Sequence, residues 1–126
     1  PEDYRDYDFV IDSEAIYCND FDESARLIRD IHERLVGGGA FWSRTFAPGT
    51  WGVESGERIG RDYWLANEGP LAEAGPVRLT RLESVPELYG SGWASISVGE
   101  ITRHEGNPQQ LIREWIIVAR KPKSAR

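Results

Sequence analysis

The spacing of apolar residues near the start of the chain predicts a strand followed by a helix. Phe9-Val10-Ile11 is a short continuous run of strand-forming residues, which is typical of a parallel strand covered on both faces. Between Phe21 and Leu35 the apolar residues recur at helical spacing, at Leu27, Ile28, Ile31 and Leu35. Asn19 or Asp20 can cap the first turn. The pattern is therefore a buried strand and then an amphipathic helix.

A run of glycines predicts where this helix ends. Gly37 to Gly39 follow it directly, and glycine tolerates the left-handed backbone of a helix C-cap and of the turn beyond. Ala40 to Phe46 then has the composition of a second strand. A strand, a covering helix and another strand form a right-handed crossover unit, so we expect the two strands to be parallel.

The end of the chain predicts a β-hairpin. Ser95 to His104 and Leu111 to Arg120 read as strands, joined by Glu105-Gly106-Asn107-Pro108. Trp115 to Ala119 is continuously apolar, so we expect the second strand to be central and covered on both sides. The apolar residues of the first strand change face at Gly99, which predicts a bulge there.

The middle of the chain, from Ala47 to Pro76, is interrupted by many glycines and prolines and predicts a long loop. A loop of this length in a compact domain is usually functional or mobile. A short helix within Ile59 to Asn67 is compatible with the pattern. Ser84 can cap another short helix that runs through Tyr89.

Composition narrows the class of protein. A chain of 126 residues forms one ordinary domain, and its net charge of −6 argues against a general nucleic-acid binder. Lys121, Lys123 and Arg126 form a short basic tail that we expect to be solvated. No apolar run approaches the ~20 residues of a membrane-spanning helix. The single cysteine, Cys18, excludes an internal disulfide framework and indicates a reducing cytoplasm. No histidine or cysteine spacing predicts a metal site.

Two segments resemble motifs of class I S-adenosylmethionine-dependent methyltransferases. Phe9-Val10-Ile11-Asp12-Ser13-Glu14-Ala15-Ile16-Tyr17-Cys18-Asn19 resembles the family's fourth motif, and Leu35-Val36-Gly37-Gly38-Gly39-Ala40 resembles its leucine, lysine, proline, glycine, glycine turn. Val36 and Gly37 stand where the family has lysine and proline. The resemblance implies an α/β fold, namely the C-terminal half of a Rossmann-like sheet with two parallel strands, a crossover helix and an antiparallel hairpin. Residues 1–126 would be a single partial domain, with 47–76 as a substrate-side loop or lid.

The same resemblance implies S-adenosylmethionine as cofactor and a small molecule as methyl acceptor. Ligands of open α/β sheets bind beyond the carboxyl ends of the strands. The cofactor cleft would accordingly be lined by Asp12, Ser13, Ile16 and Tyr17. Arg44 and Trp51 would lie on the substrate side. A catalytic base is not assigned, although Asp12 and Tyr17 are the first candidates.

The charged residues near this cleft have structural interpretations as well. Asp12 and Glu14 could act as acid and base or hold a metal, or Asp12 could cap a turn while Glu14 is solvated. Arg44 lies in an otherwise apolar strand and needs a partner, because burying an unpaired charge is costly. That partner is either an acidic substrate or Asp12.

The strand at Phe9-Val10-Ile11 has the composition of a central strand, yet only Pro1 to Asp8 precedes it. The chain could be a fragment whose N-terminal half, with the glycine-rich cofactor loop, lies upstream. The edge strand could instead pair with another copy, or Pro1 to Asp8 could fold back over it. The rival function is thus a non-catalytic half-domain that assembles through this edge. A carbohydrate-binding module built on the tryptophans is disfavoured, because such modules are usually all-β.

Overall fold

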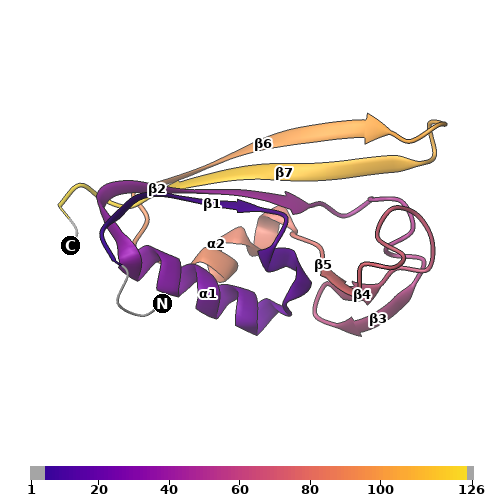
Figure 1. The fold of residues 1–126 in the computed structure, drawn as a ribbon, viewed down its shortest axis with the longest axis horizontal. Coiled ribbons are helices and arrows are strands. Elements are labelled where there is room, and N and C mark those ends of the chain that lie inside the picture. Colours follow the sequence, from indigo (N-terminus) through magenta and orange to yellow (C-terminus); the bar gives the residue numbers. More distant parts are fainter. Residues whose placement is uncertain (1–4, 125–126) are drawn as a thin grey trace.

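A mixed four-stranded sheet organises the computed structural model, which describes residues 5–124. Its strands lie in the order β1-β2-β7-β6, with β1 and β2 parallel and the other neighbouring pairs antiparallel. The expected parallel pair and terminal hairpin are confirmed, and in Figure 1 the hairpin runs well beyond the end of β1. The strand bounds are β1 Tyr7–Ser13, β2 Leu35–Phe46, β6 Ser95–His104 and β7 Leu111–Arg120.

Helix α1 (Phe21–Arg34) makes the crossover from β1 to β2. The Asp20 carboxylate accepts a hydrogen bond of 2.9 Å from the Glu23 N–H, so Asp20 is the N-cap. The acidic side chains of the first turn also interact favourably with the positive end of the helix dipole. This end of the helix forms as the sequence predicts.

The other end of α1 differs from the prediction. Leu35 already has extended backbone and begins β2, so Gly37 to Gly39 lie inside the strand and do not form a helix C-cap. The Lys121 ammonium instead donates hydrogen bonds of 2.8 Å to the carbonyl oxygens of His32 and Leu35. Lys121 is only 3% exposed, so it is not part of a solvated tail. A cation beside the last carbonyls also interacts favourably with the negative end of the helix dipole.

Both α-helices cover the same face of the sheet (Figure 1). Helix α2 (Val85–Tyr89) has the predicted bounds, with Pro86 in its first turn and Gly90 at its C-cap with φ 78°. The Ser84 side chain, however, makes no capping hydrogen bond. The core under this face joins both helices to the central strands; its fully buried members include Ile28, Phe41, Leu88 and Ile117.

The opposite face of the sheet carries no helix among residues 5–124 (Figure 1). Side chains alternate between faces along a strand. Val10 accordingly packs against the core, while Phe9 and Ile11 are 51% and 62% exposed. In β7, Ile117 is buried whereas Val118 is half-buried. The prediction that β1 and the apolar part of β7 are covered on both faces is wrong for the residues described here.

The β6–β7 hairpin has a regular register. Gly99 pairs with Ile116 between two regular neighbouring pairs, Val98 with Ile117 and Glu100 with Trp115. The predicted bulge is therefore wrong. The apolar residues of β6 simply lie on both faces of a regular strand. Val98 pairs with Ile117, which belongs to the core on the helix-covered face, whereas Ile101 pairs with Glu114 on the opposite face.

The segment 47–76 is not one long loop. It contains β3 (Glu57–Gly60), β4 (Tyr63–Leu65) and the first residue of β5 (Pro76–Arg78), which form a second, antiparallel sheet. The short helix expected within Ile59 to Asn67 is thus wrong. Gly52 has φ +85°, and a Cβ there would lie 1.9 Å from the Glu68 carbonyl oxygen. Glycine at this position allows two backbone segments to touch, which a larger residue would prevent.

A buried arginine fastens this small sheet to α1. Arg78 is 2% exposed and donates hydrogen bonds of 2.9 Å to the hydroxyl groups of Ser24 and Thr80. Burial lowers the pKa of the Arg78 guanidinium. Ser24, which the hydrophobic pattern alone leaves without a role, is fully buried and belongs to this contact.

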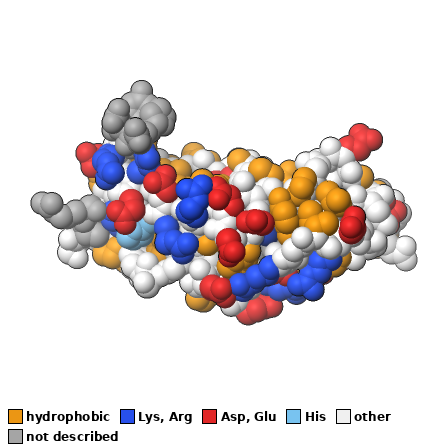
Figure 2. Space-filling model, turned by 90° about the horizontal axis from the view of Figure 1, so that it is seen from below, with side chains coloured by type: hydrophobic (Ala, Val, Ile, Leu, Met, Phe, Trp, Pro, Cys, Tyr) orange, Lys and Arg blue, Asp and Glu red, His pale blue; other side chains and the backbone are white. Residues whose placement is uncertain are grey.

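Figure 2 shows the side of the molecule that carries α1. Acidic and basic side chains lie interspersed over much of this side, and apolar side chains gather toward the end formed by β3 to β5. Ile59 and Leu65 of that sheet are 41% and 38% exposed. No helix within residues 5–124 combines the length and apolar character needed to cross a membrane.

Replacing Lys121 by alanine should lower the free energy of unfolding by about 1–3 kcal/mol, because two carbonyl oxygens at the end of α1 lose a charged donor. Urea denaturation followed by circular dichroism measures the change. Lys123→Ala is the matched control, because Lys123 is exposed. Equal stabilities of the two variants would contradict this role of Lys121.

Candidate functional site

The residues after β1 form a tight turn that leads into the short 3-10 helix η1 (Ile16–Cys18). The Asp12 carboxylate is 6% exposed and accepts hydrogen bonds from the Ala15 and Ile16 N–H groups at 2.9 and 3.0 Å. Its second oxygen accepts a hydrogen bond of 2.7 Å from the Ser43 hydroxyl of β2. The turn-capping interpretation of Asp12 is confirmed. These three donors occupy much of its accepting capacity.

Glu14 has a different environment from Asp12. Its backbone lies in the left-handed region, with φ 59°, and its N–H donates a hydrogen bond of 2.9 Å to the Arg44 carbonyl oxygen. One carboxylate oxygen lies 3.2 Å from Arg44 Nε. The Glu14 side chain is 27% exposed, so the interpretation of Glu14 as simply solvated is wrong.

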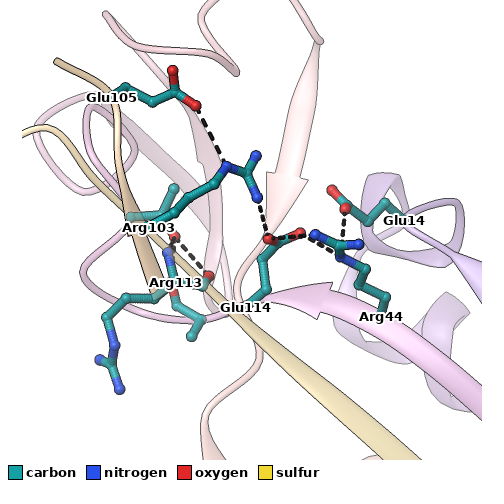
Figure 3. Close-up of polar contacts among 8 residues, drawn as sticks. Glu14, Arg44, Arg103, Glu105, Arg113 and Glu114 are labelled. Carbon is teal, nitrogen blue, oxygen red and sulfur yellow. Dashed lines mark hydrogen bonds and ion pairs between the residues drawn. The ribbon is translucent and has the colours of Figure 1, made fainter. Parts of the chain in front are cut away.

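Arg44 lies between two glutamates, Glu14 and Glu114, and forms an ion pair with each (Figure 3). Its Nε and Nη2 donate to the two carboxylate oxygens of Glu114 in β7, at 2.9 Å each. Arg103 of β6 donates a third hydrogen bond of 2.7 Å to Glu114. Pairing of Arg44 with Asp12, one of the two expected alternatives, is therefore wrong. We call Glu14, Arg44, Arg103 and Glu114 the charged cluster.

Burial and charge set the protonation of the two glutamates. Burial, together with the neighbouring Glu114 carboxyl group, raises the pKa of Glu14 from 4.5 to about 7, against the lowering effect of Arg44 and Arg103. Burial acts on Glu114 in the same direction, but hydrogen bonds from Arg44 and from the Glu14 carboxyl group lower the pKa of Glu114. Glu114 is thus the more acidic carboxyl group of the pair, and Glu14 is the one that binds a proton more readily.

The other residues predicted for the cofactor side also lie at the carboxyl end of β1. Ser13 is exposed and pairs in register with Arg44, whereas Ile16 and Tyr17 are half-buried. The Tyr17 ring packs edge-on against Phe46, with ring centroids 5.1 Å apart. Burial and the charge of Glu14 raise the pKa of Tyr17. Ser13 and Tyr17 thus neighbour the charged cluster, whereas Ile16 packs against the hydrophobic core.

Trp51 belongs to the segment between β2 and β3. It follows the end of β2, and its N–H donates to the Leu111 carbonyl oxygen at the start of β7. A Cβ added at Gly69 would lie 3.2 Å from the Trp51 ring, so this ring packs closely on the segment before β5. Trp51 thus contacts the segment before β5 and the start of β7, whereas Arg44 contacts Glu14 and Glu114.

Two members of the charged cluster, Arg103 and Glu114, are absent from the sequence-based candidates. A signal for Glu114 does exist, because it is a charged residue beside the apolar run that begins at Trp115. The argument that requires a partner for Arg44 applies equally to Glu114. Their pairing across β2 and β7, by contrast, depends on a strand register that short-range patterns do not encode.

The cluster suits proton transfer better than metal binding. Two arginines already neutralise Glu114, and an added cation would have to compete with them. Within residues 5–124, histidine, cysteine, aspartate and glutamate side chains form no group of three or more that could hold a metal ion.

Solved structures define the class of the fold as the Rossmann-like α/β fold of class I methyltransferases. An S-adenosylmethionine-dependent methyltransferase from Methanosarcina mazei superposes with a TM-score of 0.67 at 18% identity, over 95% of this chain and 62% of that one. The N-methyltransferase NodS from Bradyrhizobium japonicum, solved with S-adenosylhomocysteine, superposes with a TM-score of 0.56 at 13% identity, over 94% of this chain and 47% of that one. No protein-family model and no curated protein sequence matches this chain.

A third neighbour is the 1,6-didemethyltoxoflavin-N1-methyltransferase from Burkholderia thailandensis, solved with bound 1,6-didemethyltoxoflavin and S-adenosylhomocysteine. It superposes with a TM-score of 0.55 at 16% identity, over 91% of this chain and 44% of that one. The fold implied by the sequence resemblance is thus confirmed. The chain spans between 44% and 62% of the length of these structures.

Replacing Arg44 by alanine should lower the free energy of unfolding by about 3 kcal/mol, because the fully buried Glu114 loses two of its hydrogen bonds. The matched control is Arg26→Ala, which removes an exposed ion pair with Glu23 on α1. That control should change the stability by less than about 1 kcal/mol. Urea denaturation at pH 7 measures both variants. A loss for Arg44→Ala no larger than that of the control would contradict a structural role of the pair.

Proposed function

We propose that this chain is part of an S-adenosylmethionine-dependent methyltransferase that acts on a small molecule. The observation that carries the proposal is the topology: the β1–α1–β2 crossover followed by the β6–β7 hairpin, in a sheet that superposes on methyltransferases. S-adenosylhomocysteine in two of those structures supports S-adenosylmethionine as the cofactor. The small-molecule ligand in one of them supports a small methyl acceptor.

The cofactor cleft in this proposal lies at the carboxyl end of β1. Asp12 shapes the turn, while Ser13, Ile16 and Tyr17 line the cleft. Arg44 and the segment 47–76, including Trp51, form the substrate side. Such sites lie beyond the carboxyl ends of parallel strands, where Figure 3 shows Glu14 and Arg44 meeting Glu114. The free, exposed Cys18 suits a reducing cytoplasm as the location.

The reaction is an in-line displacement at the activated methyl group of the sulfonium. Aligning the acceptor with that carbon supplies much of the rate, because effective molarities of well-oriented reactants are large. The role of the protein is therefore mainly to bind, orient and exclude water. Nucleic acid and membranes have no part in this proposal.

Calorimetric titration with S-adenosylhomocysteine tests the proposal on the 126-residue chain and on the longest reading frame that contains it. Binding by either one is expected at the carboxyl end of β1. Ser13→Trp should abolish it by filling the cleft. The matched control, Ser97→Trp, places the same bulk on exposed β6 and should leave binding unchanged. Absence of binding by both polypeptides would contradict the proposal.

A second function is favoured by the outer edge of β1. Within residues 5–124 no strand pairs with that edge, and Phe9 and Ile11 expose apolar surface beside it. An unpaired apolar edge strand is a template for another strand. We infer that this edge assembles either with the remainder of a methyltransferase sheet or with a second copy. Residues 1–4, part of the segment expected to fold back, lie outside the described residues.

Ile11→Lys should weaken self-association or assembly, because it places a charge on the exposed apolar edge. Light scattering over a range of concentrations measures the effect. Ile59→Lys, at an exposed position of β3, is the matched control and should leave the association state unchanged. A wild-type monomer at high concentration would contradict pairing between copies.

A further inference from the structure

Two carboxylates at the end of β1 differ in solvent exposure and in how many hydrogen bonds they already accept. Asp12 is buried and accepts hydrogen bonds from two backbone N–H groups and from Ser43. Glu14 is partly exposed, and among the described residues it forms an ion pair with Arg44, at 3.2 Å. Asp12 is therefore committed to the turn. Glu14 keeps accepting capacity and access to solvent.

The backbone holds Glu14 in place. A left-handed φ of 59° is uncommon for glutamate and persists only where the surrounding structure requires it. The hydrogen bond from the Glu14 N–H to the Arg44 carbonyl oxygen ties this residue to the end of β2. Glu14 consequently lies beside the carboxyl ends of both parallel strands, where a ligand of this fold would lie.

The neighbouring charges leave Glu14 incompletely neutralised. Arg44 gives both of its hydrogen bonds to Glu114, and Arg103 adds a third. Glu14 shares Arg44 with Glu114 and faces the Glu114 carboxylate at the same time (Figure 3). Tyr17 is the other titratable group with an electrostatic contact to Glu14. A carboxylate that faces another carboxylate binds a proton more readily than a free one, which is the property required of a general base.

We propose that Glu14 is the proton acceptor for an N–H or O–H methyl acceptor in the proposed methyl transfer, on which this inference rests. The acceptor's N–H or O–H proton passes to a Glu14 carboxylate oxygen while the acceptor's lone pair forms a bond to the methyl carbon. The carbon–sulfur bond breaks, and its electron pair stays on sulfur. The products are the methylated acceptor, S-adenosylhomocysteine and protonated Glu14, which returns its proton to solvent.

The rest of the charged cluster positions this group. Glu114 keeps Arg44 engaged, so that Arg44 orients Glu14 without fully neutralising it. Arg103 compensates the buried charge of Glu114 from β6. Arg44, Arg103 and Glu114 thus act through Glu14 and are positioning residues in this proposal.

Sinefungin provides the test, because it is an S-adenosylmethionine analogue that carries a primary amine where the methyl group is transferred. In the polypeptide that binds S-adenosylhomocysteine, sinefungin should bind about tenfold more tightly, since its ammonium meets the Glu14 carboxylate. The preference should increase as the pH rises through about 7, because Glu14 is then ionised. Glu14→Gln should abolish the preference and leave the affinity for S-adenosylhomocysteine unchanged.

Glu105→Gln is the matched control, because Glu105 is an exposed carboxylate that contacts Arg103 only at the margin of the cluster. It should retain the sinefungin preference. If the wild-type polypeptide does not bind S-adenosylhomocysteine, the proposed function fails. If it binds S-adenosylhomocysteine but does not prefer sinefungin, or if Glu14→Gln leaves that preference unchanged, the role of Glu14 is overturned.

Carbon-13 NMR of the glutamate carboxyl groups tests Glu14 without any ligand. The signal that Glu14→Gln removes should titrate near pH 7 in the 126-residue chain. A midpoint near the ordinary value of 4.5 would overturn the proposal whatever the chain binds.

Discussion

The ion pair between Arg44 and Glu114 is the interaction on which the organisation of the site depends. Glu114 has no exposed side-chain surface, so it can be ionised there only because two arginines donate to it. Arg44 comes from β2 and Arg103 from β6, and Glu114 lies on β7 between them. A buried charge with this many partners disfavours any other strand register, since a shift would leave it unpaired. The pair therefore defines where the end of β2 lies, and with it the position of Glu14.

The two faces of the sheet have different roles. One face is covered by α1 and α2 and contains the core, and there Asp12 and Ser43 are used to build the turn after β1. The other face exposes Phe9 and Ile11 and carries the charged cluster at one end. An apolar surface next to an unpaired strand edge is suited to contact with more protein, and the neighbouring structures are longer than this chain. Assembly and chemistry would then take place on the same side of the molecule.

Local patterns predicted the elements well and their surroundings poorly. Apolar spacing predicted β6, β7 and the parallel crossover, and capping residues predicted α2 and an N-cap of α1 at Asn19 or Asp20, because these depend on residues close in sequence. Among residues 5–124 the predicted coverage of β1 and β7 on both faces was wrong, because composition does not say which elements are available to cover a strand. The glycines of the segment 47–76 indicated a loop, whereas Gly52 permits close backbone packing beside a small sheet. Glycine has the same local backbone preferences in a loop and in a close backbone contact. Only the contact of Gly52 with Glu68 shows which of the two roles this glycine has.

The sequence by itself determined the α/β class, the strand–helix–strand unit and the hairpin, because hydrophobic periodicity and turn residues act over short distances. Only the tertiary structure decided which charged residues contact one another at the end of β1. Asp12 and Glu14 are two positions apart and chemically alike, yet one caps a turn and the other meets Arg44. The pairing of Arg44 with Glu114 joins residues 70 positions apart, so it follows from the register of β2 against β7. Long-range register sets these charge contacts, and no short stretch of sequence specifies it.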